Sequence, residues 1–215
     1  MDFAFMLRFA PEFGKGIALT LWLTALGVFF SVAIGILCVL LLHFKRPFLS
    51  RCCRFYIELS RNTPLLIQLF FLYYGLPKLG IALSSFTCAV IGLSFLGGSY
   101  MAESLRSGLE AVRHAQIQSG MSLGLSEWQN LRYVIAPQAL AVAMPSLSAN
   151  IIFLLKETSV VSIIALGDVV YKMTELNSIY YKTDELLLLL FLCYLAMILP
   201  LSLFLARLEK RFARV

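Results

Sequence analysis

GIALTLWLTALGVFFSVAIGILCVLLL, residues 16–42, is a long run of amino acids without a single charge. An α-helix rises about 1.5 Å per residue, so about 20 apolar residues already cross a hydrocarbon core about 30 Å thick. A signal peptide would have a shorter apolar core of about 7 to 15 residues, followed by a cleavage site at small residues. This run is too long for that and no such site follows it, so we expect it to span a membrane.

The composition of the whole chain agrees with a membrane location. Of its 215 residues, 60% are hydrophobic and only 14% are charged, and the mean hydropathy is +0.85. These values lie outside the range of soluble domains. We therefore expect an all-α membrane protein that forms a single domain over residues 1–215.

Five apolar stretches are predicted to cross the membrane. Their approximate ranges are 16–43, 63–83, 86–108, 138–156 and 185–207. Five crossings place the two termini on opposite faces, and the connections on one face hold twice as many Lys and Arg residues as those on the other. Because positive charge is enriched on the cytoplasmic side, we predict an external N-terminus and a cytoplasmic C-terminus.

A polar interruption, SLGLSEWQNL at residues 122–131, falls on the predicted cytoplasmic side. Gly124 stands where a helix commonly ends, since glycine adopts the left-handed backbone without a Cβ clash. Ser126 and Gln129 have the spacing of a capping box that starts a second helix, and Pro137 is expected to stop or kink that helix. Residues 110–135 are therefore predicted to form a cytoplasmic helix-turn-helix elbow.

The apolar residues of the elbow, Met121, Leu125 and Trp128, are predicted to lie near one face. Such a face could lie in the membrane interface as an amphipathic anchor, or it could dock a soluble partner. The residues alone leave both alternatives open. Nucleic acid is not an expected partner, because residues 116–131 contain no Lys or Arg to neutralise phosphates.

Polar side chains inside apolar spans are costly, so each is a candidate for function. Gln68 could contact a solute or form a hydrogen bond between helices. Ser94 lies among small residues that favour close helix packing, with a pathway wall as the alternative. Glu157, Thr158 and Ser159 could bind an ammonium group or form a solvated helix end. Glu103 and Arg106 fit an ion pair within one helix.

Several classes of chemistry are not expected in this chain. No G-x-x-x-x-G-K-[ST] motif occurs, so ATP binding by a P-loop is excluded and any ATPase must be another polypeptide. The five cysteines lack ligand spacing and are predicted to be free thiols, and we expect no metal site. An intramembrane enzyme would need a nucleophile and a base on facing spans, and neither histidine has a serine or aspartate at an informative spacing.

The elbow resembles the cytoplasmic signature of the permease subunits of ATP-binding-cassette (ABC) importers for polar amino acids. That signature reads Glu-Ala-Ala, three residues, Gly, nine residues, then Ile-x-Leu-Pro. Here Gln118-Ser119-Gly120 occupies the triplet, Gly124 the glycine, and residues 134–137, VIAP, the end. Because glutamine replaces the acid, we expect docking at this elbow to rest on shape and apolar contact more than on charge.

Four further stretches extend the resemblance to the histidine, glutamine and arginine branch of this family. They are RNTPLLIQLFFLYYGLP (61–77), SYMAESLRSGLEAV (99–112), LGLSEWQNLRYVIAPQAL (123–140) and LLKETSVVSIIALGD (154–168). The resemblance implies the type I importer permease fold in a bacterial inner membrane. It also implies a dimer with an identical or homologous permease, an external solute-binding protein, and two cytoplasmic ATPase subunits that carry ATP and Mg.

The resemblance also assigns roles to the candidate residues. The elbow becomes the coupling helix that sits in a cleft of the ATPase, with contributions from Gln118, Ser119, Gly120, Gly124, Leu125, Ser126, Trp128 and Pro137. The predicted solute pathway comprises Gln68, Ser94, Glu157, Thr158 and Ser159, with Gln68 and Glu157 contacting a glutamine, glutamate or basic amino acid. The alternative is an ATP-independent channel or secondary carrier, which would work alone and would not need a docking elbow.

Overall fold

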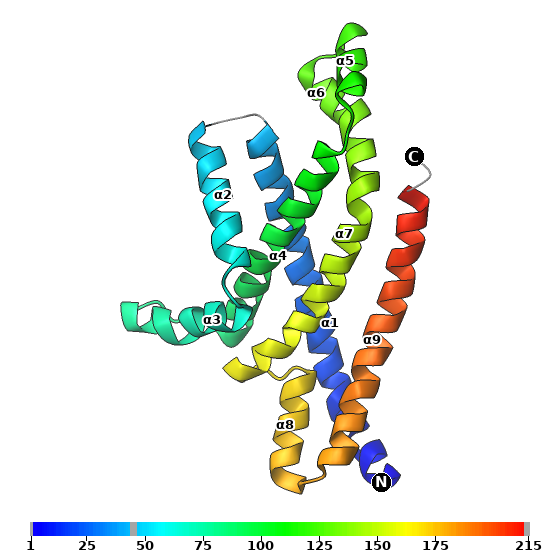
Figure 1. Ribbon diagram of the computed structural model, residues 1–215. Helices are drawn as coiled ribbons and strands as arrows, with labels where there is room; N and C mark the ends of the chain where they lie inside the picture. Colours follow the sequence, from blue (N-terminus) through cyan, green and yellow to red (C-terminus); the bar gives the residue numbers. More distant parts are fainter. Residues whose placement is uncertain (1, 44–46, 213–215) are drawn as a thin grey trace.

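The computed structural model describes residues 2–43 and 47–212, and every regular element within these ranges is helical (Figure 1). The α-helices are α1 (Phe3–His43), α2 (Pro47–Arg61), α3 (Leu65–Phe70), α4 (Ser85–Glu110), α5 (His114–Ser122), α6 (Glu127–Asn130), α7 (Ala136–Glu157), α8 (Val169–Tyr180) and α9 (Thr183–Phe212). Two π-helical turns, η1 (Phe71–Gly75) and η3 (Leu131–Ile135), and two 3₁₀ helices, η2 (Leu76–Leu79) and η4 (Thr158–Ile164), join them. The predicted all-α class is confirmed.

Small residues allow α1 and α4 to pack closely along the middle of the bundle. A Cβ added to Gly97 would overlap the hydroxyl of Ser31, and one added to Gly35 would lie 3.0 Å from the backbone nitrogen of Ala102. Around this contact Leu23, Leu93 and other fully buried residues form the main core. The small residues of the third predicted span therefore serve close helix packing. All five cysteines are free thiols, as predicted.

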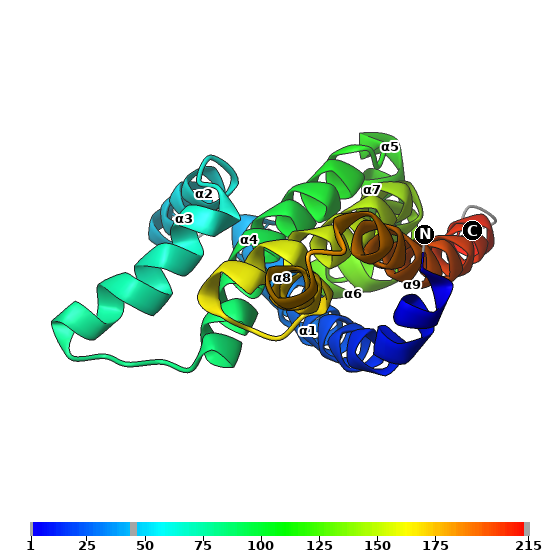
Figure 2. The ribbon, with the colours of Figure 1, turned by 90° about the horizontal axis from the view of Figure 1, so that it is seen from below.

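The structure corrects the predicted second span. Four helical segments within the described residues are long and apolar enough to cross a membrane, covering residues 3–42, 85–110, 127–164 and 183–212. The expected span at 63–83 is instead a shorter apolar helix, Leu65–Leu79, that projects sideways from the bundle (Figures 1 and 2). The π-helical turn η1 interrupts it, and Gly80, with a left-handed φ of 85°, ends it. The amphipathic helix α2, which precedes it in the chain, packs on α4.

Of the stop or kink predicted at Pro137, the stop does not occur. The helix runs from Glu127 through η3 into α7, and Pro137 is the second residue of α7. The π-helical turn accommodates it: the N–H of Ala136 bonds to the carbonyl of Leu131, five residues back. The first elbow helix begins at His114, since α4 continues to Glu110.

Helix α8 was not predicted from the sequence. Asp168 caps its start, accepting hydrogen bonds from the N–H groups of Tyr171 (2.8 Å) and Val170 (3.3 Å). The helix packs against α1, where a Cβ on Gly16 would lie 3.0 Å from the Cα of Val169. The cap at Asp168 was the signal in the sequence that could have located it.

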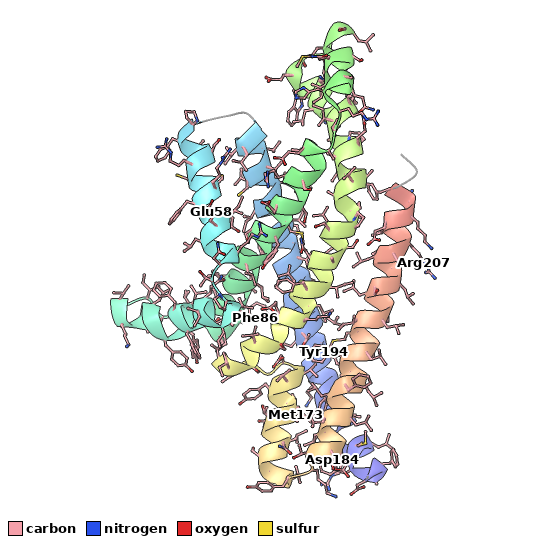
Figure 3. The ribbon with its side chains drawn as sticks, in the orientation of Figure 1. Glu58, Phe86, Met173, Asp184, Tyr194 and Arg207 are labelled. Carbon is pink, nitrogen blue, oxygen red and sulfur yellow. The ribbon has the colours of Figure 1, made fainter. Side chains whose placement is uncertain are left out.

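The two ends of the molecule differ in what they carry (Figure 1). The N-terminus, α8 and the α8–α9 turn lie at one end, while α5, α6 and the C-terminus lie at the other. Figure 3 shows the same polarity along α9, with Asp184 at the first end and Arg207 near the second. The termini thus lie at opposite ends of the bundle, and the side that faces the cytoplasm stays a prediction.

Candidate functional site

The elbow protrudes beyond the ends of α4 and α7 as a pair of short helices (Figure 1). Helix α5 ends at Gly124, which has a φ of 79°. The N–H of Gly124 bonds to Met121 O at 2.9 Å, and the N–H of Leu125 bonds to Gly120 O at 3.3 Å. This pair of hydrogen bonds forms a Schellman motif, which satisfies the last carbonyls of the helix. The role predicted for Gly124 as a helix end is confirmed.

The capping box predicted at Ser126 is also present. The Ser126 hydroxyl accepts a hydrogen bond from the N–H of Gln129 at 3.3 Å, and Gln129 Oε1 accepts one from the N–H of Ser126 at 2.9 Å. Both sides of the turn are therefore closed by local hydrogen bonds. The two helices leave the turn in fixed directions.

Asn130, which the sequence analysis missed, locks the two elbow helices together. Its side chain is 1% exposed, and its Nδ2 donates to the carbonyl of Ile117 at 2.9 Å. Gly120 faces this amide so closely that an added Cβ would overlap it. A buried amide needs a partner, but Gln129 and Arg132 make this stretch polar in any case, so Asn130 does not stand out in the sequence.

The outer surface of the elbow is apolar, but its composition differs from the predicted face. Met121 and Trp128 are exposed as expected, at 53% and 54%, whereas Leu125 is half-buried and Leu123 is 81% exposed. Gln118 and Ser119 are exposed, and the Ser119 hydroxyl bonds to Ala115 O within α5. The elbow therefore presents large apolar side chains on a rigid protrusion.

Gln68 lies at the bend between α2 and α3. Its Nε2 donates to Thr63 O at 3.0 Å and to Ser60 O at 3.3 Å, so it ties the start of α3 to the end of α2. Its Oε1 is buried and has no hydrogen-bond partner within the described residues. Helix α3 contacts η4, which brings Gln68's helix against the segment that holds Thr158 and Ser159.

Helix α7 ends at Glu157, and Glu157, Thr158 and Ser159 differ in how their polar groups are used. The Thr158 hydroxyl is fully buried and donates to Leu155 O at 2.6 Å, and the Ser159 carbonyl accepts from Ser162 Oγ. Glu157 is half-buried, and among the residues that the structure describes its carboxylate has no hydrogen bond or ion pair. A half-buried carboxylate without a partner is suited to bind a cationic group.

Ser94 is buried and donates to Val90 O at 2.6 Å, one turn earlier in α4. Its hydroxyl is therefore satisfied within its own helix and packs against the bundle. The ion pair predicted between Glu103 and Arg106 is present, and Arg106 also pairs with Glu110. Of the predicted pathway residues, the structure thus groups Glu157, Thr158 and Ser159, brings α3 against them, and places Ser94 in the helix packing.

Comparison with known families identifies the chain over most of its length. The family of the binding-protein-dependent transport system inner membrane component matches residues 27–214. This range includes the elbow, the whole of α4, α7 and α9, and α1 from Gly27 onward.

Individual relatives agree with this match. The probable amino-acid ABC transporter permease protein PatM of Vibrio harveyi is 33% identical over 94% of this chain and 92% of its own length. The glutamine transport system permease protein GlnP of Escherichia coli K12 is 31% identical over 94% and 93%. The arginine transport system permease protein ArtQ of Bacillus subtilis is 30% identical, again over 94% and 93%.

Solved structures share the fold. A crystal structure of an amino acid ABC transporter with histidines matches with a TM-score of 0.91 and 34% identity, covering 98% of this chain and 99% of the other. An inward-facing conformation of the MetNI methionine ABC transporter matches with a TM-score of 0.81 over 95% and 98%. At 18% identity, that likeness concerns the fold alone.

Proposed function

Because this chain belongs to the family of binding-protein-dependent transport system inner membrane components, we propose that it is the permease subunit of an ATP-driven importer for a polar amino acid. The proposed solutes are glutamine, glutamate or a basic amino acid. The names of GlnP and ArtQ support glutamine and arginine among them. The chain forms the translocation path together with a second, identical or homologous permease in the bacterial inner membrane. A solute-binding protein delivers the solute on the outer side.

The observation that carries this proposal is the rigid apolar elbow. A protrusion closed by a Schellman motif and a capping box exposes Met121, Leu123 and Trp128 at low entropic cost. Large apolar and aromatic side chains of this kind are typical anchors of protein interfaces. We assign this surface to the ATPase subunit, which carries ATP and Mg, and closure of the ATPase on the elbow switches the permease between outward and inward access.

The solute contacts proposed for this chain lie toward the other end. The carboxylate of Glu157 binds the solute ammonium, Ser159 assists, and Gln68 contributes its amide where α3 meets η4. The half-burial of Glu157 and the buried, unpartnered Oε1 of Gln68 support this arrangement. In this orientation the elbow and the C-terminus face the cytoplasm and the N-terminus faces outward.

The test is reconstitution of the chain with the ATPase and the binding protein encoded beside its gene. Leu123→Glu and Trp128→Glu should abolish copurification of the ATPase and ATP-dependent uptake of L-glutamine or L-arginine into proteoliposomes. Tyr181→Glu is the matched control, because Tyr181 is 83% exposed in the α8–α9 turn at the opposite end. It should leave ATPase binding intact.

Two results would contradict the proposal. Uptake by the chain alone, without ATPase or ATP, would indicate the channel or carrier alternative. Retention of the ATPase by both elbow variants would mean that coupling occurs elsewhere. Glu157→Gln and Gln68→Ala test the pathway, and unchanged uptake kinetics and unchanged solute-stimulated ATP hydrolysis in both variants would remove the solute contacts while leaving the elbow assignment in place.

A further inference from the structure

A cavity of about 930 Å³ lies at the elbow end of the molecule, between α2, α4 and α5. A smaller hollow of about 300 Å³ toward α7 shares Arg61, Tyr100, Glu103, Arg106 and Glu110 with it. Pockets that bind small molecules typically measure about 300 to 1,000 Å³. Nothing in the function proposed above uses this space, whose lining includes neither Glu157 nor Gln68.

The charges in the cavity are balanced and come from two helices. Three guanidinium groups and three carboxylates line it, together with His114. They are Arg54, Glu58 and Arg61 on α2, and Glu103, Arg106 and Glu110 on α4. Figure 3 shows Glu58 on α2. A charged group that is already paired has less capacity to bind a ligand, so the partners of each group indicate its role.

Arg106 is fully engaged by its own helix. Its guanidinium pairs with Glu103 through Nη2 and with Glu110 through Nη1. These contacts join residues one turn apart on α4, and they hold Glu103 and Glu110 in place. Arg106 therefore has few donors left for a ligand.

Arg61 is held differently. Its Nη1 lies 3.7 Å from Glu103 Oε2, which is too long for a hydrogen bond, and this is its one ion pair within the described residues. Its guanidinium carbon lies 5.5 Å from the centre of the Tyr100 ring, and its side chain is 41% exposed. The Tyr100 ring positions the Arg61 guanidinium, and the N–H donors of the guanidinium stay available for a ligand. Such a fork binds a carboxylate through two parallel hydrogen bonds.

Carboxylates stand beside this guanidinium on both helices. Glu103 Oε2 faces Arg61 across the 3.7 Å gap, and Glu58 lies one turn before Arg61 on α2 and lines the same cavity. On the α7 side, Asn150 Nδ2 donates to Ser104 Oγ at 2.8 Å, which makes that wall polar as well. A small molecule with one carboxylate and one ammonium group complements this arrangement, and a free amino acid is such a molecule.

We propose that the elbow-side cavity is a second binding station for the transported amino acid, with Arg61 binding the solute carboxylate and Glu103 and Glu58 binding its ammonium. The station rests on the proposed import function and extends it: the solute passes from the Glu157 region to this cavity before release. A zwitterionic phospholipid headgroup offers a phosphate and an ammonium of similar chemistry, so the test must separate it from the solute.

The experiment uses the complete transporter in nanodiscs without nucleotide. Uptake assays first establish whether L-glutamine or L-arginine is imported. Equilibrium binding of that amino acid and of its α-amide, L-glutaminamide or L-argininamide, is then measured in a Glu157→Gln background, so that binding near Glu157 does not mask the cavity. Arg61→Gln is compared with Arg51→Gln, which removes an exposed cation from the same helix outside the cavity.

Arg61→Gln should weaken binding of the amino acid by about tenfold or more and remove its preference over the α-amide, because a bidentate charge-assisted pair is lost. Arg51→Gln should bind like the parent. Arg61→Lys keeps the charge without the fork, so it should bind with intermediate affinity. Copurification of the ATPase with each variant verifies folding.

Equal affinity in Arg61→Gln and Arg51→Gln would overturn the second station while leaving the import function intact. Native mass spectra could show that the parent retains phosphatidylethanolamine and that Arg61→Gln loses it without a change in amino-acid affinity. That result would assign the cavity to lipid and would also overturn the second station. Import of none of L-glutamine, L-glutamate and the basic amino acids would instead remove both proposals.

Discussion

Asp168 is fully buried at the start of α8, where its carboxylate accepts hydrogen bonds from Val170 and Tyr171. The N–H of Val169 also bonds to Thr20 Oγ1 on α1 at 3.4 Å, so the cap fixes α8 against the bundle. Burial disfavours the charged form and raises the pKa of Asp168 from its usual 3.8 to about 6 despite the backbone hydrogen bonds.

This raised pKa predicts how stability depends on pH. A carboxyl whose folded pKa is raised favours the folded state below its unfolded pKa, and that contribution is lost as pH rises from about 4 through about 6. At about 1.4 kcal/mol per unit of pKa, the loss is about 3 kcal/mol. Thermal unfolding from pH 4 to pH 8 measures it. Asp168→Asn keeps an acceptor for the cap and should flatten this part of the profile, whereas parallel profiles for the two proteins would refute the assignment.

Single residues also show what local sequence can predict within the candidate site. Gly124, Ser126 and the pair Glu103 and Arg106 act through neighbours at most four residues away, and all were predicted correctly. Arg61 and Tyr100 meet only because α2 packs on α4, so no spacing in the sequence indicates their contact. The solute contacts proposed for Glu157 and Gln68 stay predictions.

At the scale of helices, the elbow depends on how closely α5 approaches α6. Gly120→Ala should separate them, because the new methyl group would overlap the amide of Asn130, which has no exposed space to move into. Overpacking of this kind costs about 1 to 3 kcal/mol. Hydrogen exchange of the α5 and α6 amides should speed up, and ATPase binding should weaken.

Gly14→Ala is the matched control for this substitution. Gly14 lies in α1 with nothing within 4 Å of an added Cβ, so alanine should be neutral or stabilise the helix by up to about 1 kcal/mol. Gly120→Ala and Gly14→Ala could show the same hydrogen-exchange rates in the elbow. In that case the packing of Gly120 against Asn130 would not be required to hold α5 and α6 together.

Three features at this scale were not predicted from the sequence. The chain between α1 and α4 forms two helices, α2 and α3, in place of one span. The bend between them depends on packing against α4 and on the hydrogen bonds that Gln68 makes to Thr63 and Ser60. A π-helical turn accommodates Pro137, and helix propensities do not predict where such a turn forms. Helix α8 is short and of mixed polarity, so it lacks the long apolar run by which the membrane-spanning helices were predicted.

For the whole molecule, the separation of the two ends predicts sidedness. Leu123 in the elbow and Tyr181 in the α8–α9 turn are both highly exposed and lie at opposite ends. In a Cys52→Ser background, which removes the exposed native thiol, Leu123→Cys should react with a membrane-impermeant maleimide only in inverted vesicles. Tyr181→Cys should react only in right-side-out vesicles. The reversed pattern would place the N-terminus in the cytoplasm.

The continuous helix that replaces the predicted stop at Pro137 has a mechanical consequence. From Glu127 to Glu157 it acts as one lever arm about 45 Å long at 1.5 Å per residue. If the elbow end serves as the pivot, a tilt of about 10° swings the Glu157 carboxylate through an arc of about 8 Å. In the proposed mechanism, a small rotation imposed by the ATPase would thus move the end proposed to face the solute by more than the width of an amino-acid ammonium, without any change in the helix itself.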